Sequence, residues 1–146
     1  MTSAALQRSQ RWVSYAACLW ALLFAIPHTW WALGINAGLP GGDRSYNLFM
    51  ASTWRVAFNL MVIVLSGLVI IIALRLLRPP EQVLRRWLPR TAAWIACGML
   101  TLRGVAGIIV DGTEDPVWWP TFLIGGILLG GVAWLAGAAR PADSLR

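Results

Sequence analysis

Arg103 is an always-charged residue inside an otherwise apolar stretch, "TAAWIACGMLTLRGVAGIIVDG", which runs from Thr91 to Gly112. This stretch is long enough to cross a bilayer. An arginine near the centre of a membrane helix costs roughly 2.5–3.5 kcal/mol on insertion scales, so its presence needs a reason. A guanidinium binds phosphate or carboxylate in a bidentate fork, and it also ties helices together by donating to backbone carbonyls. The sequence leaves both roles open.

Four further polar positions and one aromatic position are expected in the same half of the membrane as Arg103. Taking about 1.5 Å per residue from the nearest predicted boundary, His28 lies ~4.5 Å deep, Asn59 ~7.5 Å and Arg103 ~13 Å. The sequence predicts no comparable polar group in the other half. The candidate ligand-binding residues are His28, Trp31, Arg55, Asn59, Arg103 and Asp111.

Asp111 is an unsuitable partner for Arg103 because eight residues separate them by ~12 Å along the helix and ~80° around it. Helical side chains also lean toward the N-terminus, which directs Arg103 away from Asp111. We therefore expect Arg103 to meet Asn59, or the Leu23 carbonyl that the proline of the first span leaves without its helical donor. Asp111 is better placed to meet Arg55 at the membrane surface.

The elements that position these residues are four apolar stretches. The chain has 146 residues, 58% hydrophobic and 12% charged, whereas soluble domains carry about 25% charged residues. Each stretch approaches the ~20 residues that span a bilayer. We expect an all-α protein, a single integral membrane domain in which four transmembrane helices form an antiparallel bundle. The predicted spans are 12–34, 54–77, 90–110 and 117–139.

The charges predict an orientation. Nine arginines border the two termini and the second connection, against two at the other ends of the spans. This asymmetry places both termini and the middle loop in the cytoplasm. The middle loop, "RLLRPPEQVLRRWLPR", is expected to lie at the inner surface and to contact anionic lipid. The first span has no small-x-small cleavage site and is expected to remain as an anchor in the plasma (inner) membrane. With the positive charge explained by topology, we expect no nucleic-acid partner.

Small residues recur at helical spacing along the spans and predict close contacts between helices, because lipid provides no hydrophobic drive for association. The two cysteines lie within spans, form no C-x-x-C pair, and are expected to pack as small side chains. No metal-ligand cluster or cofactor motif is present, so none is expected. The predicted contact positions include Ser14, Cys18, Ala21, Asn59, Ser66, Ala93, Cys97, Gly104, Gly107, Gly126, Gly130, Ala133 and Gly137.

Three motifs resemble a family of small bacterial four-helix membrane proteins of unknown function: "HTWWALG", "LRGVAGIIVD" and "WWPTFLIGGILLG". Members show His-x-x-Trp-Ala-x-Gly after the first span and Arg-x-x-Gly near the end of the third. Ile35 stands where the family has a second glycine. The resemblance implies the architecture but supplies no activity. The matching positions are His28, Trp31, Ala32, Gly34, Arg103, Gly104, Gly107 and Asp111.

The leading functional hypothesis is a non-enzymatic binding or accessory protein, whose outer-leaflet polar pocket accepts an anionic lipid or small molecule. One alternative is a structural subunit that assembles with itself or with a membrane partner through glycine-rich helix faces. A proton-coupled exporter is less favoured, because no carboxylate lies deeper than Asp111. An intramembrane enzyme is also less favoured, because only His28 and Asp111 could form an acid–base pair and no nucleophile motif accompanies them.

Overall fold

The structure, a computed structural model, describes residues 3–35, 54–77, 83–111 and 117–138. These residues form four helices and no strand, so the predicted all-α four-helix architecture is confirmed. The second predicted span matches its helix in both bounds. The helices are α1 (Ser3–Ala32), α3 (Trp54–Leu77), α4 (Val83–Asp111) and α5 (Trp118–Ala138).

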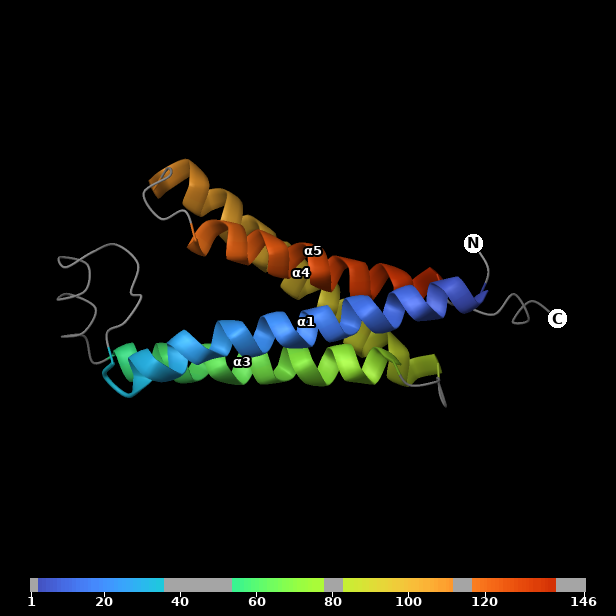
Figure 1. Ribbon diagram of the computed structural model, residues 1–146, viewed down its shortest axis with the longest axis horizontal. Coiled ribbons are helices and arrows are strands. Elements are labelled where there is room, and N and C mark those ends of the chain that lie inside the picture. Colours follow the sequence, from blue (N-terminus) through green and yellow to red (C-terminus); the bar gives the residue numbers. More distant parts are fainter. Residues whose placement is uncertain (1–2, 36–53, 78–82, 112–116, 139–146) are drawn as a thin grey trace.

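The helices lie in two adjacent pairs. α1 packs along α3 and α4 along α5, while α1 and α5 join the pairs (Figure 1). The start of α1, the end of α3, the start of α4 and the end of α5 lie together, and we name this the terminal end. Toward the other end, named here the opposite end, α4 and α5 diverge from α1 and α3 in Figure 1. The predicted polar residues belong to the opposite end.

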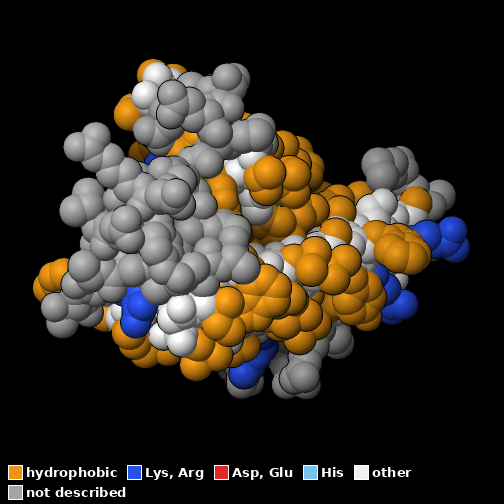
Figure 2. All heavy atoms as spheres, turned by 60° about the vertical axis from the view of Figure 1, so that its left-hand side comes forward, with side chains coloured by type: hydrophobic (Ala, Val, Ile, Leu, Met, Phe, Trp, Pro, Cys, Tyr) orange, Lys and Arg blue, Asp and Glu red, His pale blue; other side chains and the backbone are white. Residues whose placement is uncertain are grey.

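All four helices are long and apolar enough to cross a membrane. Large hydrophobic side chains are exposed along their outer faces, and hydrophobic side chains cover most of the described surface in the view of Figure 2. A surface this apolar is far beyond the patches that soluble monomers expose. The chain is therefore a multi-pass integral membrane protein, as its composition predicts.

Two helices begin earlier than expected. α1 begins at Ser3 rather than near residue 12, and α4 begins at Val83 and continues through Pro89. The arginine-rich stretch before Pro89 therefore forms the first turns of α4. Pro89 thus lies within α4, and prolines are tolerated inside membrane helices.

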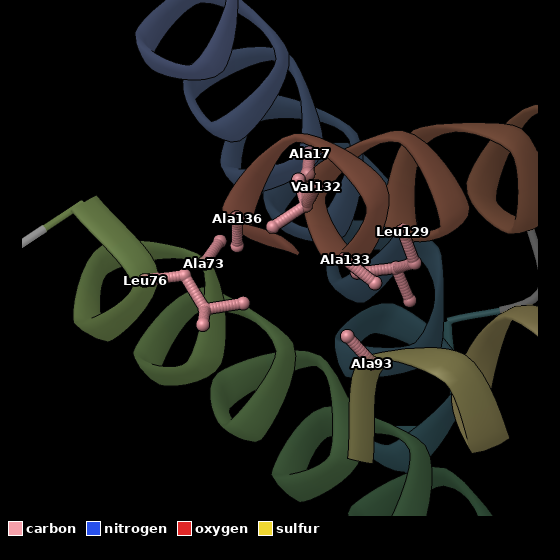
Figure 3. Close-up of a cluster of buried hydrophobic side chains, with 8 residues drawn as sticks. All are labelled: Ala17, Ala73, Leu76, Ala93, Leu129, Val132, Ala133 and Ala136. Atoms are coloured by element: carbon pink, nitrogen blue, oxygen red, sulfur yellow. The ribbon is translucent and has the colours of Figure 1, made fainter. Parts of the chain in front are cut away.

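The hydrophobic core lies toward the terminal end, where all four helices contribute small side chains (Figure 3). Five of its eight residues are alanines, which let the backbones approach closely. The cluster consists of Ala17, Ala73, Leu76, Ala93, Leu129, Val132, Ala133 and Ala136.

Glycines continue this close packing toward the opposite end. A Cβ on Gly126 would meet Thr101 and the Cys97 carbonyl of α4, and a Cβ on Gly125 would meet the Trp20 ring of α1. A Cβ on Gly107 would enter the Trp119 ring. The predicted contact role of these small residues is confirmed, and the glycine faces of α5 are filled by helices of the same chain.

Candidate functional site

His28 and Asn59 join α1 to α3 at the opposite end. His28 Nδ1 lies 2.8 Å from Asn59 Oδ1, and Asn59 Nδ2 donates to the Arg55 carbonyl at 2.9 Å. Both side chains are buried. Because the Asn59 amide group donates to a carbonyl, its oxygen is the atom that faces the imidazole, and Nδ1 must therefore be the donor. The predicted His28 and Asn59 thus form one buried hydrogen-bonded chain.

Aromatic rings surround His28. Its ring centroid lies 4.8 Å from that of Trp31, 5.0 Å from Phe24, and 6.2 Å from both Phe58 and Trp118. These rings come from α1, α3 and α5, so three helices meet at the imidazole. The predicted Trp31 belongs to this group and is buried. We call His28 with these four rings the histidine cluster.

His28 Nε2 has no hydrogen-bonding partner within the part of the chain that the structure describes, although it is buried. With Nδ1 donating to Asn59, a neutral imidazole presents a lone pair at Nε2. Buried polar atoms in proteins are nearly always paired, and an unpaired one costs about 1–3 kcal/mol. This nitrogen is the most unusual atom of the site.

Arg103 does not meet Asn59 or the Leu23 carbonyl, and both expectations are wrong. Its Cζ lies 4.5 Å from the centroid of the Trp119 ring and 5.7 Å from that of Phe122. The reason is the arrangement of the pairs: α4 packs along α5, while α1 and α4 make no contact in the described part. Arg103 therefore faces the rings of α5, and its side chain is exposed.

Helix register also places Arg103 close to the first turn of α5. Gly107 packs against the Trp119 ring, which lies in the first turn of α5. Arg103 precedes Gly107 by one turn, about 6 Å along α4. Its long stem lets the charged group approach the head-group region.

The two polar groups lie on either side of one set of aromatic rings. Phe24 of the histidine cluster contacts Phe122, with centroids 5.4 Å apart and planes at 70°. The Phe122 ring centroid lies 6.2 Å from that of Trp119, and the Arg103 guanidinium lies over the Trp119 ring. The predicted single pocket is therefore two polar positions separated by stacked and edge-on rings.

Of the remaining predicted residues, Arg55 is half-buried in the first turn of α3. Its Nη1 lies 3.8 Å from where a Cβ on Gly34 would stand. Gly34, with φ of +85°, ends α1 in the left-handed conformation that favours glycine. The Asp111 side chain, like every acidic side chain of the protein, lies outside the described residues, and so does the predicted Arg55–Asp111 pair.

The terminal end also holds buried polar contacts, so the expectation that polar groups occupy one half only is wrong. Gln10 is buried and its Nε2 donates to the Leu76 carbonyl at 2.6 Å. Arg90 Nε donates to the Ala133 carbonyl at 3.2 Å. Gln10 lies two residues before the first predicted span and Arg90 is the first residue of the third, whereas both helices extend beyond these positions.

Sequence reasoning placed Trp31 at the site but did not identify Phe24, Phe58 or Phe122. Trp20, Phe24, His28 and Trp31 recur at steps of four, four and three, which places them along one face of α1. This aromatic stripe was the available signal. Trp20 extends it by donating from Nε1 to the Thr121 carbonyl at 3.0 Å, which ties α1 to α5.

The fold and the site together define a four-helix integral membrane protein with an aromatic cluster between a buried histidine and an exposed arginine. Comparisons with protein families, with curated proteins and with solved structures found no match to this chain. No group of three or more metal-ligating side chains occurs among the described residues. The family resemblance of the three motifs stays a prediction.

Proposed function

We propose that the protein is a non-enzymatic binding or accessory protein that recognises the anionic head group of a lipid, or a small anionic molecule, at its opposite end. The observation that carries this proposal is the exposed Arg103 guanidinium stacked over Trp119 and Phe122. A guanidinium that lies over aromatic rings keeps N–H donors to which phosphate or carboxylate oxygens bind in a fork.

Trp119 adds a second donor. Its indole Nε1 is buried and has no acceptor within the described residues, and the ring lies beside the Arg103 guanidinium. A buried N–H without an acceptor is unfavourable. An anion at the edge of the indole, within reach of the guanidinium, would satisfy both. In the proposed arrangement the opposite end faces the outside, both termini are cytoplasmic, and the protein resides in the plasma membrane, as the arginine distribution predicts.

The alternative, a structural subunit that assembles through glycine faces, loses its predicted surface. The glycines of α5 contact Trp20, Thr101 and Cys97 of the same chain. A partner helix would have to use other positions, such as Gly67 or Gly98, where an added Cβ meets nothing within 4 Å. No described contact favours that assembly over the binding role.

The test compares Arg103→Leu with Arg11→Leu, a matched variant that removes an exposed arginine from the terminal end. Each protein is titrated in nanodiscs of phosphatidylcholine with phosphatidylglycerol, and lipid binding is measured by native mass spectrometry. We expect Arg103→Leu to lose the preference for the anionic lipid and Arg11→Leu to keep it. Equal anionic-lipid binding by Arg103→Leu and the unchanged protein would contradict the proposal.

A further inference from the structure

One face of α4 is buried at the terminal end and exposed at the opposite end. Four residues spaced by three, four and three positions lie on this face: Ala93, Ala96, Leu100 and Arg103. Ala93 belongs to the core, and Ala96 and Leu100 are half-buried against it. Arg103, further along the same face, is exposed. The side of α4 that carries Arg103 is therefore the side that meets the other helices at the terminal end.

A face of α3 changes in the same way along its length. It carries four residues spaced by seven, four and seven positions: Leu76, Val69, Leu65 and Phe58. Leu76 is in the core and Val69 packs against it, whereas Leu65 and Phe58 keep about half of their surface exposed. Leu76 and Ala93 belong to one core cluster, so the two faces meet at the terminal end (Figure 3). Toward the opposite end they separate, because the helix pairs diverge (Figure 1).

Phe122 of α5 lies between the two helix pairs. Its ring centroid is 5.4 Å from that of Phe24 in α1 and 5.7 Å from the Arg103 Cζ in α4, while α1 and α4 make no contact in the described part. The separated faces of α3 and α4 therefore have α5 behind them. We name the space between these faces the α3–α4 opening, and the residues that bound it are Phe58, Leu65, Leu100, Arg103 and Phe122.

The depth of the α3–α4 opening matches one leaflet of a bilayer. Leu65 lies eleven residues from Trp54, the first residue of α3, which is about 16 Å along the helix. Half of the hydrocarbon core of a bilayer is about 15 Å thick. One acyl chain of a lipid in that leaflet therefore reaches from the membrane surface to the core. Arg103 lies at the open end, one turn from Gly107, which packs on the first turn of α5.

We propose that one anionic phospholipid occupies the α3–α4 opening, with its phosphate on Arg103 and one acyl chain along Leu65 and Phe122. The inference rests on the proposed function, because it assigns the anion of that site to a lipid rather than to a small molecule. Charge complementarity favours this occupant. A zwitterionic lipid carries its own cation, and an apolar helix of a second copy would cover the guanidinium without compensating its charge.

Cross-linking of the unchanged protein tests where the acyl chain lies. Phosphatidylglycerol with a diazirine toward the end of one acyl chain is added to nanodiscs of phosphatidylcholine, and mass spectrometry locates the residues that it labels on illumination. We expect several-fold more labelling of Leu65 than of Val64, the neighbouring residue on the outer face, which is 62% exposed. The same diazirine on phosphatidylcholine should not show this excess at Leu65.

A variant that fills the opening gives a second measurement. Leu65→Trp places a larger side chain in the path of the acyl chain, and Val64→Trp adds the same side chain on the outer face. Both variants keep Arg103. We expect Leu65→Trp to weaken phosphatidylglycerol binding several-fold in native mass spectrometry, and Val64→Trp to leave it unchanged. The cross-linking decides the matter if Leu65→Trp fails to fold.

The outcomes separate the two proposals. Preferential binding of phosphatidylglycerol with equal labelling of Leu65 and Val64 overturns the inference and leaves the proposed function standing. Glycerol phosphate that binds as tightly as the lipid does the same, because the acyl chain then contributes nothing. A dimer in native mass spectra that Leu65→Trp dissociates also overturns the inference, since a second copy then covers the opening. If neither phosphatidylglycerol nor glycerol phosphate binds in preference to phosphatidylcholine, the proposed function fails and the inference fails with it.

Discussion

His28 Nδ1 and Asn59 Oδ1 lie 2.8 Å apart, and this contact joins α1 to α3 across 31 positions of sequence. The same amide donates to the carbonyl one turn earlier in α3. The bond fixes which nitrogen of the imidazole remains for a ligand. The two ring nitrogens of His28 thus differ in role: Nδ1 ties α1 to α3, and Nε2 is the candidate binding group.

Asn59→Leu should destabilise the protein, because it leaves the buried Nδ1 donor of His28 without its acceptor. Hydrogen bonds between membrane helices contribute about 0.6–1.7 kcal/mol, and we expect a loss of that size in the free energy of unfolding. The control is Leu60→Ala at the neighbouring exposed position. Thermal unfolding in detergent measures both, and equal midpoints would contradict the assigned role of Asn59.

Gly107→Ala should destabilise the α4–α5 pair, since its methyl group would enter the Trp119 ring. Overpacking of this kind costs about 1–3 kcal/mol. Gly98→Ala on the same helix meets nothing within 4 Å and should be neutral or stabilising, since alanine favours the helix over glycine by about 1 kcal/mol. Unfolding midpoints of the two variants should therefore move apart, and a shared shift would count against the described packing.

Gln10→Leu should weaken the terminal end because it removes the donor to the Leu76 carbonyl. Gln7→Leu is the matched control, since Gln7 lies one turn earlier on the same helix and is exposed. We expect Gln10→Leu alone to lower the midpoint, by an amount that corresponds to about 1 kcal/mol. Hydrogen exchange in the last turn of α3 should rise in that variant. Unchanged exchange there would show that the contact contributes nothing.

The proposed orientation is tested by cysteine labelling in intact cells. In a background where Cys18 and Cys97 are replaced by alanine, a cysteine at Asn47 should react with an impermeant maleimide from outside. A cysteine at Gln82 should react only after the cells are opened. The reverse pattern would place the histidine cluster on the cytoplasmic side and would overturn the assignment to the outer leaflet.

Sequence alone determined the four spans, because each is a long apolar run and lipid admits only structures whose backbone groups bond internally. It also identified His28 and Asn59, since polar residues within such runs are rare and need partners. The contact faces of α5 were predictable too, because small residues at helical spacing have few other uses.

Tertiary structure decided which helices pair, and that pairing set the partner of Arg103. The depths estimated from the sequence put Asn59 within reach of Arg103. In the structure α4 pairs with α5, and the guanidinium therefore faces Trp119 and Phe122. Spacing within one helix specifies a face and not its neighbour. Which face meets which neighbour depends on how small residues from all four helices pack together, and no single segment of sequence contains that information.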